Sequence, residues 1–331
     1  MYQIFRKDYN LGNLINIKED IENLKDTFSL DIEKELDKSL EYFDSGNYYK
    51  FKDILNNILI NFRTSLGSDY SIISNWYTFS NNLLNNGFIH KFNGDFVEFS
   101  ELERQGVVNI LGNTFISYDE AKQDLLNGDI YFPKKVTALK LGALRNTCYI
   151  RCIYLHEDID DIGGDLLENS NIEEFYSFSK INYVPSGMFK KCFSLEKVYF
   201  ENKIDEIGDC AFFECNELKE VVLGKNIRNI GKQAFYKCYE LEKFDFGENI
   251  RRISDSSFEG DYLLKDINFP ETLSFVGESA FAGCTNAEVS IPCTCSFLTK
   301  SFDKVKEFTP YVPKKYALTS SPKVCKKICY Y

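Results

Sequence analysis

One motif recurs four times in the middle of the chain: LEKV at residues 195–198, LKEV at 218–221, LEKF at 241–244 and LKDI at 264–267. Successive copies start 23 residues apart. The same frame extends back to Ile172, Ile150 and Asn127, and forward to a degenerate turn near Asn286. A fixed period of this length is typical of solenoids, in which each repeat forms one turn of the chain. We therefore expect about eight stacked turns.

Each predicted turn carries apolar residues at the same places. In the turn from Leu218 they are Leu218, Val221, Leu223, Ile227, Ile230, Ala234 and Phe235. The fourth and sixth positions share one strand face, because side chains alternate along a strand. A single turn has too little apolar surface to fold alone, so stacking of neighbours should supply the stability. Glycine after the thirteenth position predicts a tight backbone turn at residues 163, 208, 231 and 277.

Three stretches narrow the type of repeat: IGDCAFFEC at 207–215, IGKQAFYKC at 230–238 and VGESAFAGC at 276–284. They resemble the BspA-type, or Treponema pallidum-type, leucine-rich repeat, and the resemblance covers roughly residues 127–300. The turn from Leu241 departs from the pattern, with Ser254 and Asp261 in place of glycine and cysteine. The resemblance implies a curved, β-rich solenoid that binds proteins, often as a surface or adhesive module.

Helical periodicity marks the start of the chain. Apolar stripes at steps of three and four run through residues 17–28, 32–43 and 51–62, and Gly46 and Gly87 are placed to end helices. We expect a helical bundle over 1–87. Asn93-Gly94 between two alternating segments predicts a β-hairpin at 88–99, followed by a mixed connector with a short helix near 119–126.

The predicted fold class is therefore α+β, with a helical amino-terminal domain followed by the solenoid. The expected domains are 1–87, a helical bundle; 88–126, a hairpin and mixed α/β connector; 127–300, a leucine-rich-repeat solenoid; and 301–331, a basic, cysteine-containing cap or tail.

Charge and hydropathy exclude several classes of function. The chain has 39 Lys and Arg against 50 Asp and Glu, a net charge of −11. Residues 1–135, 136–299 and 300–331 carry −7, −10 and +6. An acidic body argues against direct binding of nucleic acid or an anionic membrane. We see neither a signal peptide nor a transmembrane segment, so we expect a cytoplasmic location.

The cysteines could suggest catalysis or metal binding. Cys192, Cys215, Cys238 and Cys284 share one position of their turns and should form an internal, apolar ladder. The weak zinc candidates are Cys293, Cys295, Cys325 and Cys329, whose spacings are not the usual pairs. Cys152 and His156 lie four residues apart on one strand, about 13 Å between α-carbons, too far for proton transfer.

The acidic residues at 156–165 could suggest a calcium-binding loop. We expect them instead to form an acidic edge of the solenoid that is exposed to solvent. We therefore expect no enzyme activity and no cofactor.

The fifth position of each turn should point outward from the sheet. It holds tyrosine in four successive turns, at Tyr131, Tyr154, Tyr176 and Tyr199. The neighbouring positions bring Glu174, Lys197, His156, Phe178 and Glu201. Tyrosine is favoured at interfaces because it combines a large area with a polar tip. The stripe is our candidate partner-binding face; the alternatives are simple strand stacking or cover by the amino-terminal domain.

The function that fits best is a non-enzymatic module that binds another protein through the exposed face of the repeat sheet. Three alternatives remain open. The chain could be an intracellular phage- or pathogen-encoded inhibitor or effector, which blocks a host enzyme with an acidic surface. It could be a surface adhesin, or a metal-dependent enzyme that uses the cysteines of the tail.

Overall fold

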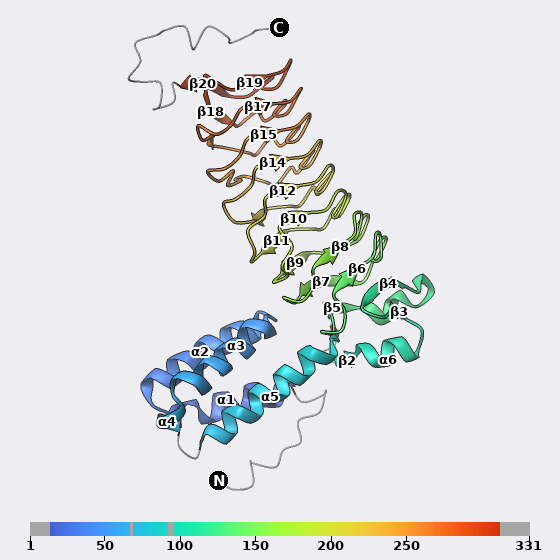
Figure 1. The fold of residues 1–331 in the computed structure, drawn as a ribbon, viewed down its shortest axis with the longest axis vertical. Coiled ribbons are helices and arrows are strands. Elements are labelled where there is room, and N and C mark those ends of the chain that lie inside the picture. Colours follow the sequence, from blue (N-terminus) through green and yellow to red (C-terminus); the bar gives the residue numbers. More distant parts are fainter. Residues whose placement is uncertain (1–13, 67–68, 92–95, 312–331) are drawn as a thin grey trace. The chain divides into compact units, whose positions relative to one another are not determined.

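The computed structural model describes residues 14–66, 69–91 and 96–311 and separates into two compact units (Figure 1). The helical unit comprises residues 1–105 and 130–135, and the repeat unit comprises 106–129 and 136–331. The predicted connector, 88–126, is thus divided between the two units. A helical region followed by a β-solenoid confirms the predicted α+β class, with about nine turns against the predicted eight.

The helical unit contains α1 (Leu14–Leu24), η3 (Lys25–Thr27), α2 (Leu30–Asp44), α3 (Tyr48–Asn61), α4 (Arg63–Leu66), α5 (Tyr70–Asn86), β1 (Phe88–Lys91), β2 (Phe96–Glu98) and α6 (Phe99–Arg104). Helix α3 packs against both α2 and α5. The predicted apolar stripe of α2 is buried, including Ile32, Leu36 and Leu40. Among the described residues, no helix is long and apolar enough to cross a membrane.

Gly87 ends α5 and leads into the predicted hairpin. It has a positive φ of 67°, and a Cβ there would lie 2.3 Å from the backbone nitrogen of Pro133. Only glycine fits this place without a shift of the backbone. Strands β1 and β2 then pair antiparallel, with Phe88 opposite Glu98 and His90 opposite Phe96.

The repeat unit begins with β3 (Val108–Leu111), β4 (Thr114–Tyr118) and η5 (Glu120–Leu126). Most of the following turns contribute one strand to what we name the front sheet, which has two separate parts. The first comprises β5 (Gly128–Tyr131), β7 (Ile150–Leu155), β9 (Glu174–Ser177), β11 (Lys197–Phe200) and β13 (Glu220–Val222), and the second comprises β16 (Ile267–Asn268), β18 (Glu288–Pro292) and β20 (Glu307–Tyr311). Strands β7, β9, β11 and β13 pair parallel and in register with one another, and so do β16, β18 and β20.

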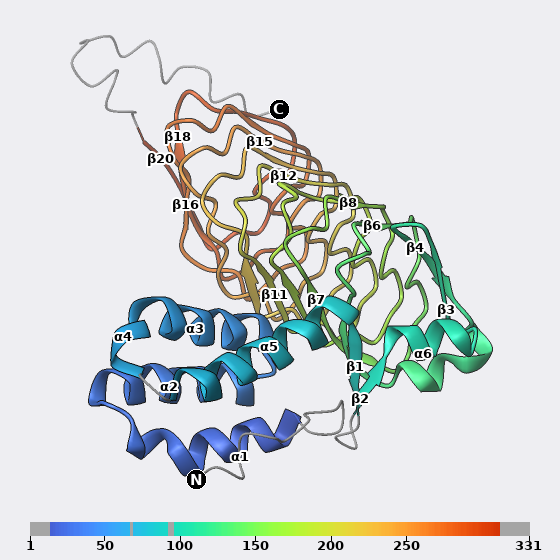
Figure 2. The ribbon, with the colours of Figure 1, turned by 60° about the horizontal axis from the view of Figure 1, so that its bottom comes forward.

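A second strand in each turn forms what we name the back sheet (Figure 2). It comprises β10 (Tyr183–Val184), β12 (Glu206–Ile207), β14 (Asn229–Ile230), β15 (Arg252–Ile253), β17 (Phe275–Val276) and β19 (Ser296–Phe297). The earlier turns contribute β6 (Ala138–Leu139) and β8 (Asp161–Ile162), which follow β4 in a separate sheet. Because β3 and β4 form an antiparallel hairpin and β4 pairs parallel with β6, the hairpin covers the first edge of this sheet.

A column of stacked phenylalanines holds the turns together. Phe212 and Phe235 stack at 4.8 Å between ring centroids, Phe235 and Phe258 at 4.9 Å, and Phe258 and Phe281 at 5.1 Å. All four rings are fully buried. Each ring fills the space that an isolated turn would leave open, so the pattern explains why neighbouring turns depend on one another.

The repeated glycines serve a different purpose from the one predicted. A Cβ at Gly231 would lie 2.6 Å from the backbone nitrogen of Asp209, and one at Gly208 would lie 2.5 Å from that of Ser186. Neither glycine has a positive φ. These positions need glycine because the backbone of the preceding turn approaches closely, and not because the chain turns into a left-handed conformation.

Candidate protein-binding face

Three tyrosines form a row on the front sheet, here called the stack, in which the first two rings are parallel and the third is tilted by 42°. Tyr154 on β7, Tyr176 on β9 and Tyr199 on β11 are register partners in adjacent parallel strands. The rings of Tyr154 and Tyr176 are 5.0 Å apart and nearly parallel, and those of Tyr176 and Tyr199 are 6.3 Å apart. Tyr154 is buried, whereas Tyr176 and Tyr199 are half-buried. The part of this stack that solvent reaches is therefore Tyr176 and Tyr199.

Charged side chains flank the stack on one side. Lys197 stands opposite Glu174 in the register and forms an ion pair with Glu220 at 3.0 Å. The hydroxyl of Tyr176 donates a hydrogen bond to Glu174 Oε2 at 3.0 Å. Burial and the neighbouring Glu174 raise the pKa of the Tyr176 phenol, so the hydroxyl stays protonated and remains a donor. On the other side of the stack, Glu201 is exposed and Phe178 is buried.

Tyr131 does not continue this stack. Although β5 starts in the repeat unit, Ile130 and Tyr131 belong to the helical unit. The Tyr131 ring stacks on Phe88 at 4.3 Å, its hydroxyl donates to the carbonyl of Gly46, and no part of it is exposed. Tyr131 is therefore a core residue of the helical unit and not part of an exposed stripe.

His156 is also removed from solvent. It is fully buried, and its Nδ1 accepts a hydrogen bond from the backbone N–H of Asp158 at 3.2 Å. Its ring is therefore not presented on the surface of the sheet as the sequence predicted.

The end of the front sheet contributes a feature that the sequence did not reveal. A shallow pocket of about 220 Å³ lies on the face of β16, β18 and β20. Its lining comprises Asp266, Asn268, Glu288, Val289, Ser290, Glu307 and Thr309. The predicted solenoid stopped at residue 300, so β20 and its share of this acidic pocket were missed. The alternating Glu307, Phe308 and Thr309 are the only signal of this strand.

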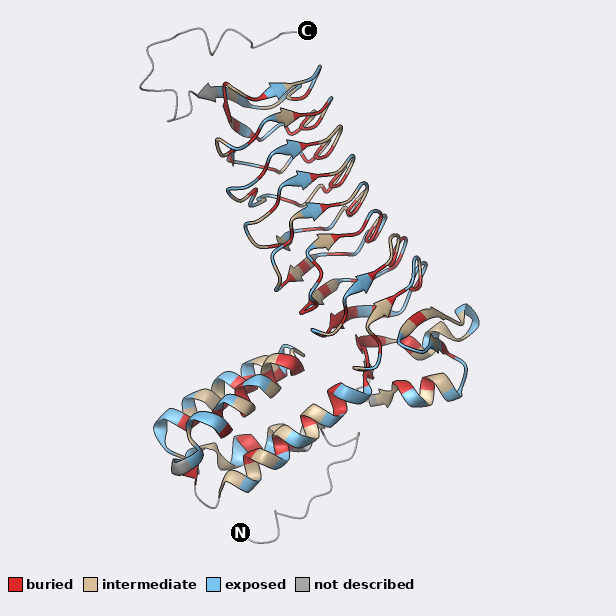
Figure 3. Cartoon of the chain, in the orientation of Figure 1, coloured by how far each residue is buried: buried red, intermediate tan, exposed pale blue. Residues whose placement is uncertain are grey.

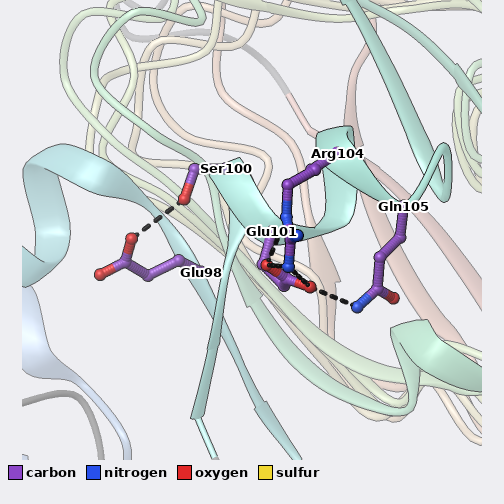
Figure 4. A network of polar contacts seen from close by, with 5 residues as sticks. All are labelled: Glu98, Ser100, Glu101, Arg104 and Gln105. Atoms are coloured by element: carbon purple, nitrogen blue, oxygen red, sulfur yellow. Dashed lines mark hydrogen bonds and ion pairs between the residues drawn. The ribbon is translucent and has the colours of Figure 1, made fainter.

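A second pocket, of about 340 Å³, lies within the helical unit. It is lined by Asn85, Asn86, Glu98, Ser100, Glu103, Pro133 and Lys135. The adjoining polar groups bond to one another (Figure 4). Ser100 donates to Glu98 at 3.0 Å, and Arg104 Nε donates to Glu101 at 3.0 Å, which lowers the pKa of the Glu101 carboxyl. The Arg104–Glu101 contact joins side chains three residues apart on α6 and stabilises this helix locally.

Comparison with known proteins identifies the repeats. The model of the BspA type leucine rich repeat region matches residues 125–212 and 182–308, with six copies. The chain belongs to this family. No curated protein matches it.

Solved structures similar to this BspA-type chain include a leucine-rich repeat protein from Bacteroides ovatus, with 25% identity, a TM-score of 0.45 and coverage of 53% of this chain and 49% of that one. A leucine rich cell surface protein from Faecalibacterium prausnitzii has 18% identity and a TM-score of 0.46, covering 60% and 54%. The Treponema pallidum leucine rich repeat protein has 16% identity and a TM-score of 0.34, covering 54% and 76%. The chain spans about half the length of the first two.

The BspA-type cysteines form the predicted internal ladder. Cys192, Cys215, Cys238 and Cys284 are fully buried. Each thiol donates to a carbonyl of the preceding turn, as Cys215 does to Phe189 at 3.0 Å and Cys238 to Phe212 at 3.2 Å. Burial raises the pKa of the Cys192 thiol to about 12 and that of the other three well above the usual value. The ladder therefore consists of protonated thiols that pack and donate hydrogen bonds.

The other cysteines that the sequence offered for thiol or metal chemistry are buried where the structure describes them. Burial and the carboxylate of Asp129 raise the pKa of the Cys152 thiol, which opposes formation of a thiolate. Cys293 and Cys295 are buried, and burial raises the pKa of Cys295 to about 12. Cys325 and Cys329 lie outside the described residues. Within the described part of the chain, no group of three or more His, Cys, Asp or Glu side chains could hold a metal ion.

Proposed function

We propose that the chain is a non-enzymatic module that binds another protein through the front sheet, with Tyr176 and Tyr199 as the central contacts. The observation that carries the proposal is the aromatic stack on adjacent parallel strands, whose last two rings remain half-exposed. Members of this repeat family are generally protein-interaction modules. A tyrosine held by its neighbours loses little side-chain entropy on binding, so it contributes affinity at low entropic cost.

The surroundings of the stack favour a partner with basic side chains. Glu174 and Glu201 flank the rings, and the pocket at the end of the sheet is lined by Asp266, Glu288 and Glu307. One of these carboxylates, Glu288, is paired with Lys306. A partner that places an apolar or aromatic residue on Tyr199 and a lysine or arginine beside Glu174 or Glu201 would match both the rings and the carboxylates. Binding should then weaken as the salt concentration rises, because salt screens exposed charges.

The test is a comparison of two double variants in the host cell. Tyr176→Ser with Tyr199→Ser removes the exposed rings of the stack. Tyr236→Ser with Tyr262→Ser is the matched control, because it removes two other solvent-accessible tyrosines of the repeat unit. Proteins that co-purify with each tagged full-length chain are quantified by mass spectrometry, and thermal unfolding checks that both variants fold.

The proposal expects at least one partner that is recovered with the unchanged chain and with the control, and is lost about tenfold or more with the first variant. Equal recovery of every partner with all three chains would contradict it.

A further inference from the structure

Three arginines gather on the outer side of the back sheet. Arg228 and Arg251 occupy equivalent places in successive turns, and the backbone N–H of Arg251 donates to the carbonyl of Arg228 at 2.8 Å. Arg252 follows on β15, and its register partner on β17 is Phe275. All three arginines are exposed, on a part of the back sheet where the strands carry exposed residues (Figure 3). We call Arg228, Arg251, Arg252 and Phe275 the arginine patch.

These arginines differ from the lysines of the same turns. Within the described residues, none of the three arginines forms an ion pair. Three of these lysines pair with acids of a neighbouring turn: Lys219 with Glu196 at 2.9 Å, Lys232 with Asp255 at 3.3 Å and Lys265 with Glu242 at 2.9 Å. The charges of these lysines are thus neutralised within the chain, whereas the three guanidinium groups form no ion pair among the described residues, in a region with a net charge of −10.

The local contacts keep the guanidinium groups available. Asp205 lies one turn before Arg228, in the equivalent place, but its carboxylate already accepts hydrogen bonds from Asn226 at 2.7 Å and Asn182 at 3.3 Å. Arg252 lies over the ring of Phe275, with 4.1 Å between the guanidinium carbon and the ring centroid. This stacking holds the flat face of one guanidinium while its N–H groups stay free to donate.

Arg228 and Arg251 occupy equivalent places in adjacent turns, whose strands are about 4.8 Å apart. Arginines repeated at this spacing suit a row of carboxylates, because each guanidinium can bind a carboxylate through two parallel hydrogen bonds. The patch holds only three positive charges, and the acidic body around it would repel a long nucleic acid. Phe275 adds an apolar surface that a peptide side chain can cover. We propose that the arginine patch is a second docking surface, separate from the front sheet, and that its ligand is a short acidic protein segment with an apolar residue between the acids.

The experiment measures binding of a fluorescein-labelled peptide, Glu-Leu-Glu-Glu-Leu-Glu, to the full chain by fluorescence anisotropy. A peptide with Gln in place of every Glu serves as the uncharged comparison, and a short DNA duplex tests whether any polyanion suffices. We expect the acidic peptide to bind at least about tenfold more tightly than its Gln counterpart, and to lose affinity between about 0.03 M and about 0.3 M salt. It should also bind more tightly than the duplex.

The decisive variant is Arg228→Ser with Arg251→Ser and Arg252→Ser, which should weaken binding about tenfold or more. The control is Lys219→Ser with Lys243→Ser and Lys265→Ser, which removes the same charge from exposed positions nearer the front sheet and should leave the affinity within about twofold. Arg252→Lys should also weaken binding, because an ammonium group keeps the charge but loses the planar fork. Three results would each overturn the proposal: no preference for the acidic peptide, an equal loss in the arginine and lysine variants, or tighter binding of the duplex.

Discussion

Asp261 occupies the place in its turn that Cys238 occupies in the turn before, and its Oδ1 accepts a hydrogen bond from the backbone N–H of Cys238 at 2.8 Å. The carboxyl is fully buried in a ladder that otherwise consists of thiols, and Oδ2 has no hydrogen-bond partner. Burial raises the pKa of this carboxyl well above its usual value, against the smaller opposing effect of the bond from Cys238. A buried acid that stays protonated resembles its thiol neighbours, since both are neutral and both carry a proton to donate.

The first prediction concerns the pH dependence of stability. Because the pKa of Asp261 is higher in the folded chain than in the unfolded chain, its stabilising contribution is complete below the unfolded pKa, about 3.9, and is lost as the pH rises through the folded pKa. One such group changes the free energy of unfolding by at most about 1.4 kcal/mol per pH unit. Urea unfolding of the repeat unit between about pH 4 and pH 8 measures the slope.

The control variants for Asp261 are Asp261→Asn, which cannot ionise, and Asp261→Cys, which restores the ladder. In both variants, the free energy of unfolding should no longer fall with pH by the amount that Asp261 contributes. At alkaline pH both variants should unfold at a higher urea concentration than the unchanged chain. An unchanged slope in both variants would mean that Asp261 does not titrate in this range.

The second prediction concerns the phenylalanine column. Phe235 is fully buried between Phe212 and Phe258, so Phe235→Ala should cost about 3–5 kcal/mol in the free energy of unfolding. The matched control is the adjacent Tyr236→Ala, which removes a half-buried ring that stacks on Phe213 at 5.0 Å and should cost about 1 kcal/mol. Chemical denaturation of both variants gives the comparison. Equal losses would show that the column carries no special share of the stability.

The sequence predicted those features that depend on the repeated environment of each turn. Cys215 and Phe235 recur at a fixed spacing because every turn faces an identical neighbour, so their burial could be read from the period alone. Tyr131 satisfied the same period but is buried elsewhere, because the chain leaves the repeat unit at Ile130. A period cannot show which element a strand end packs against.

The arginine patch escaped the sequence analysis for a related reason. Arg228, Arg251 and Arg252 stand at outward positions that carry different residues in other turns, such as Asp205 and Ser274. Their significance comes from the absence of ion pairs and from the contact with Phe275, which only the three-dimensional arrangement reveals. The pocket on β16, β18 and β20 likewise depends on the ninth turn, whose sequence has lost the apolar motif of the central repeats.

The third prediction separates two reasons why a position requires glycine. Gly87 and Gly112 have nearly the same positive φ, 67° and 63°, but a Cβ would contact the backbone of Pro133 at Gly87 and nothing within 4 Å at Gly112. Gly112→Ala should therefore cost only the left-handed strain, about 1–2 kcal/mol, whereas Gly87→Ala adds a steric clash of about 1–3 kcal/mol. Thermal unfolding of the two variants measures the difference. A smaller loss at Gly87 than at Gly112 would contradict the close approach to Pro133.

The last prediction tests the assignment of Tyr131 to the helical unit. Tyr131→Ala removes a fully buried ring that stacks on Phe88 and contacts Tyr48, so it should cost about 3–5 kcal/mol and act on the helices. Tyr131→Phe keeps the ring and loses only the hydrogen bond to the Gly46 carbonyl, at about 1 kcal/mol. Hydrogen exchange read by mass spectrometry distinguishes the two units. Faster exchange in α3 and α5, with β11 and β14 unchanged, is the expected result for Tyr131→Ala. Faster exchange confined to the strands of the repeat unit would instead show that the Tyr131 ring stabilises that unit and not the helices.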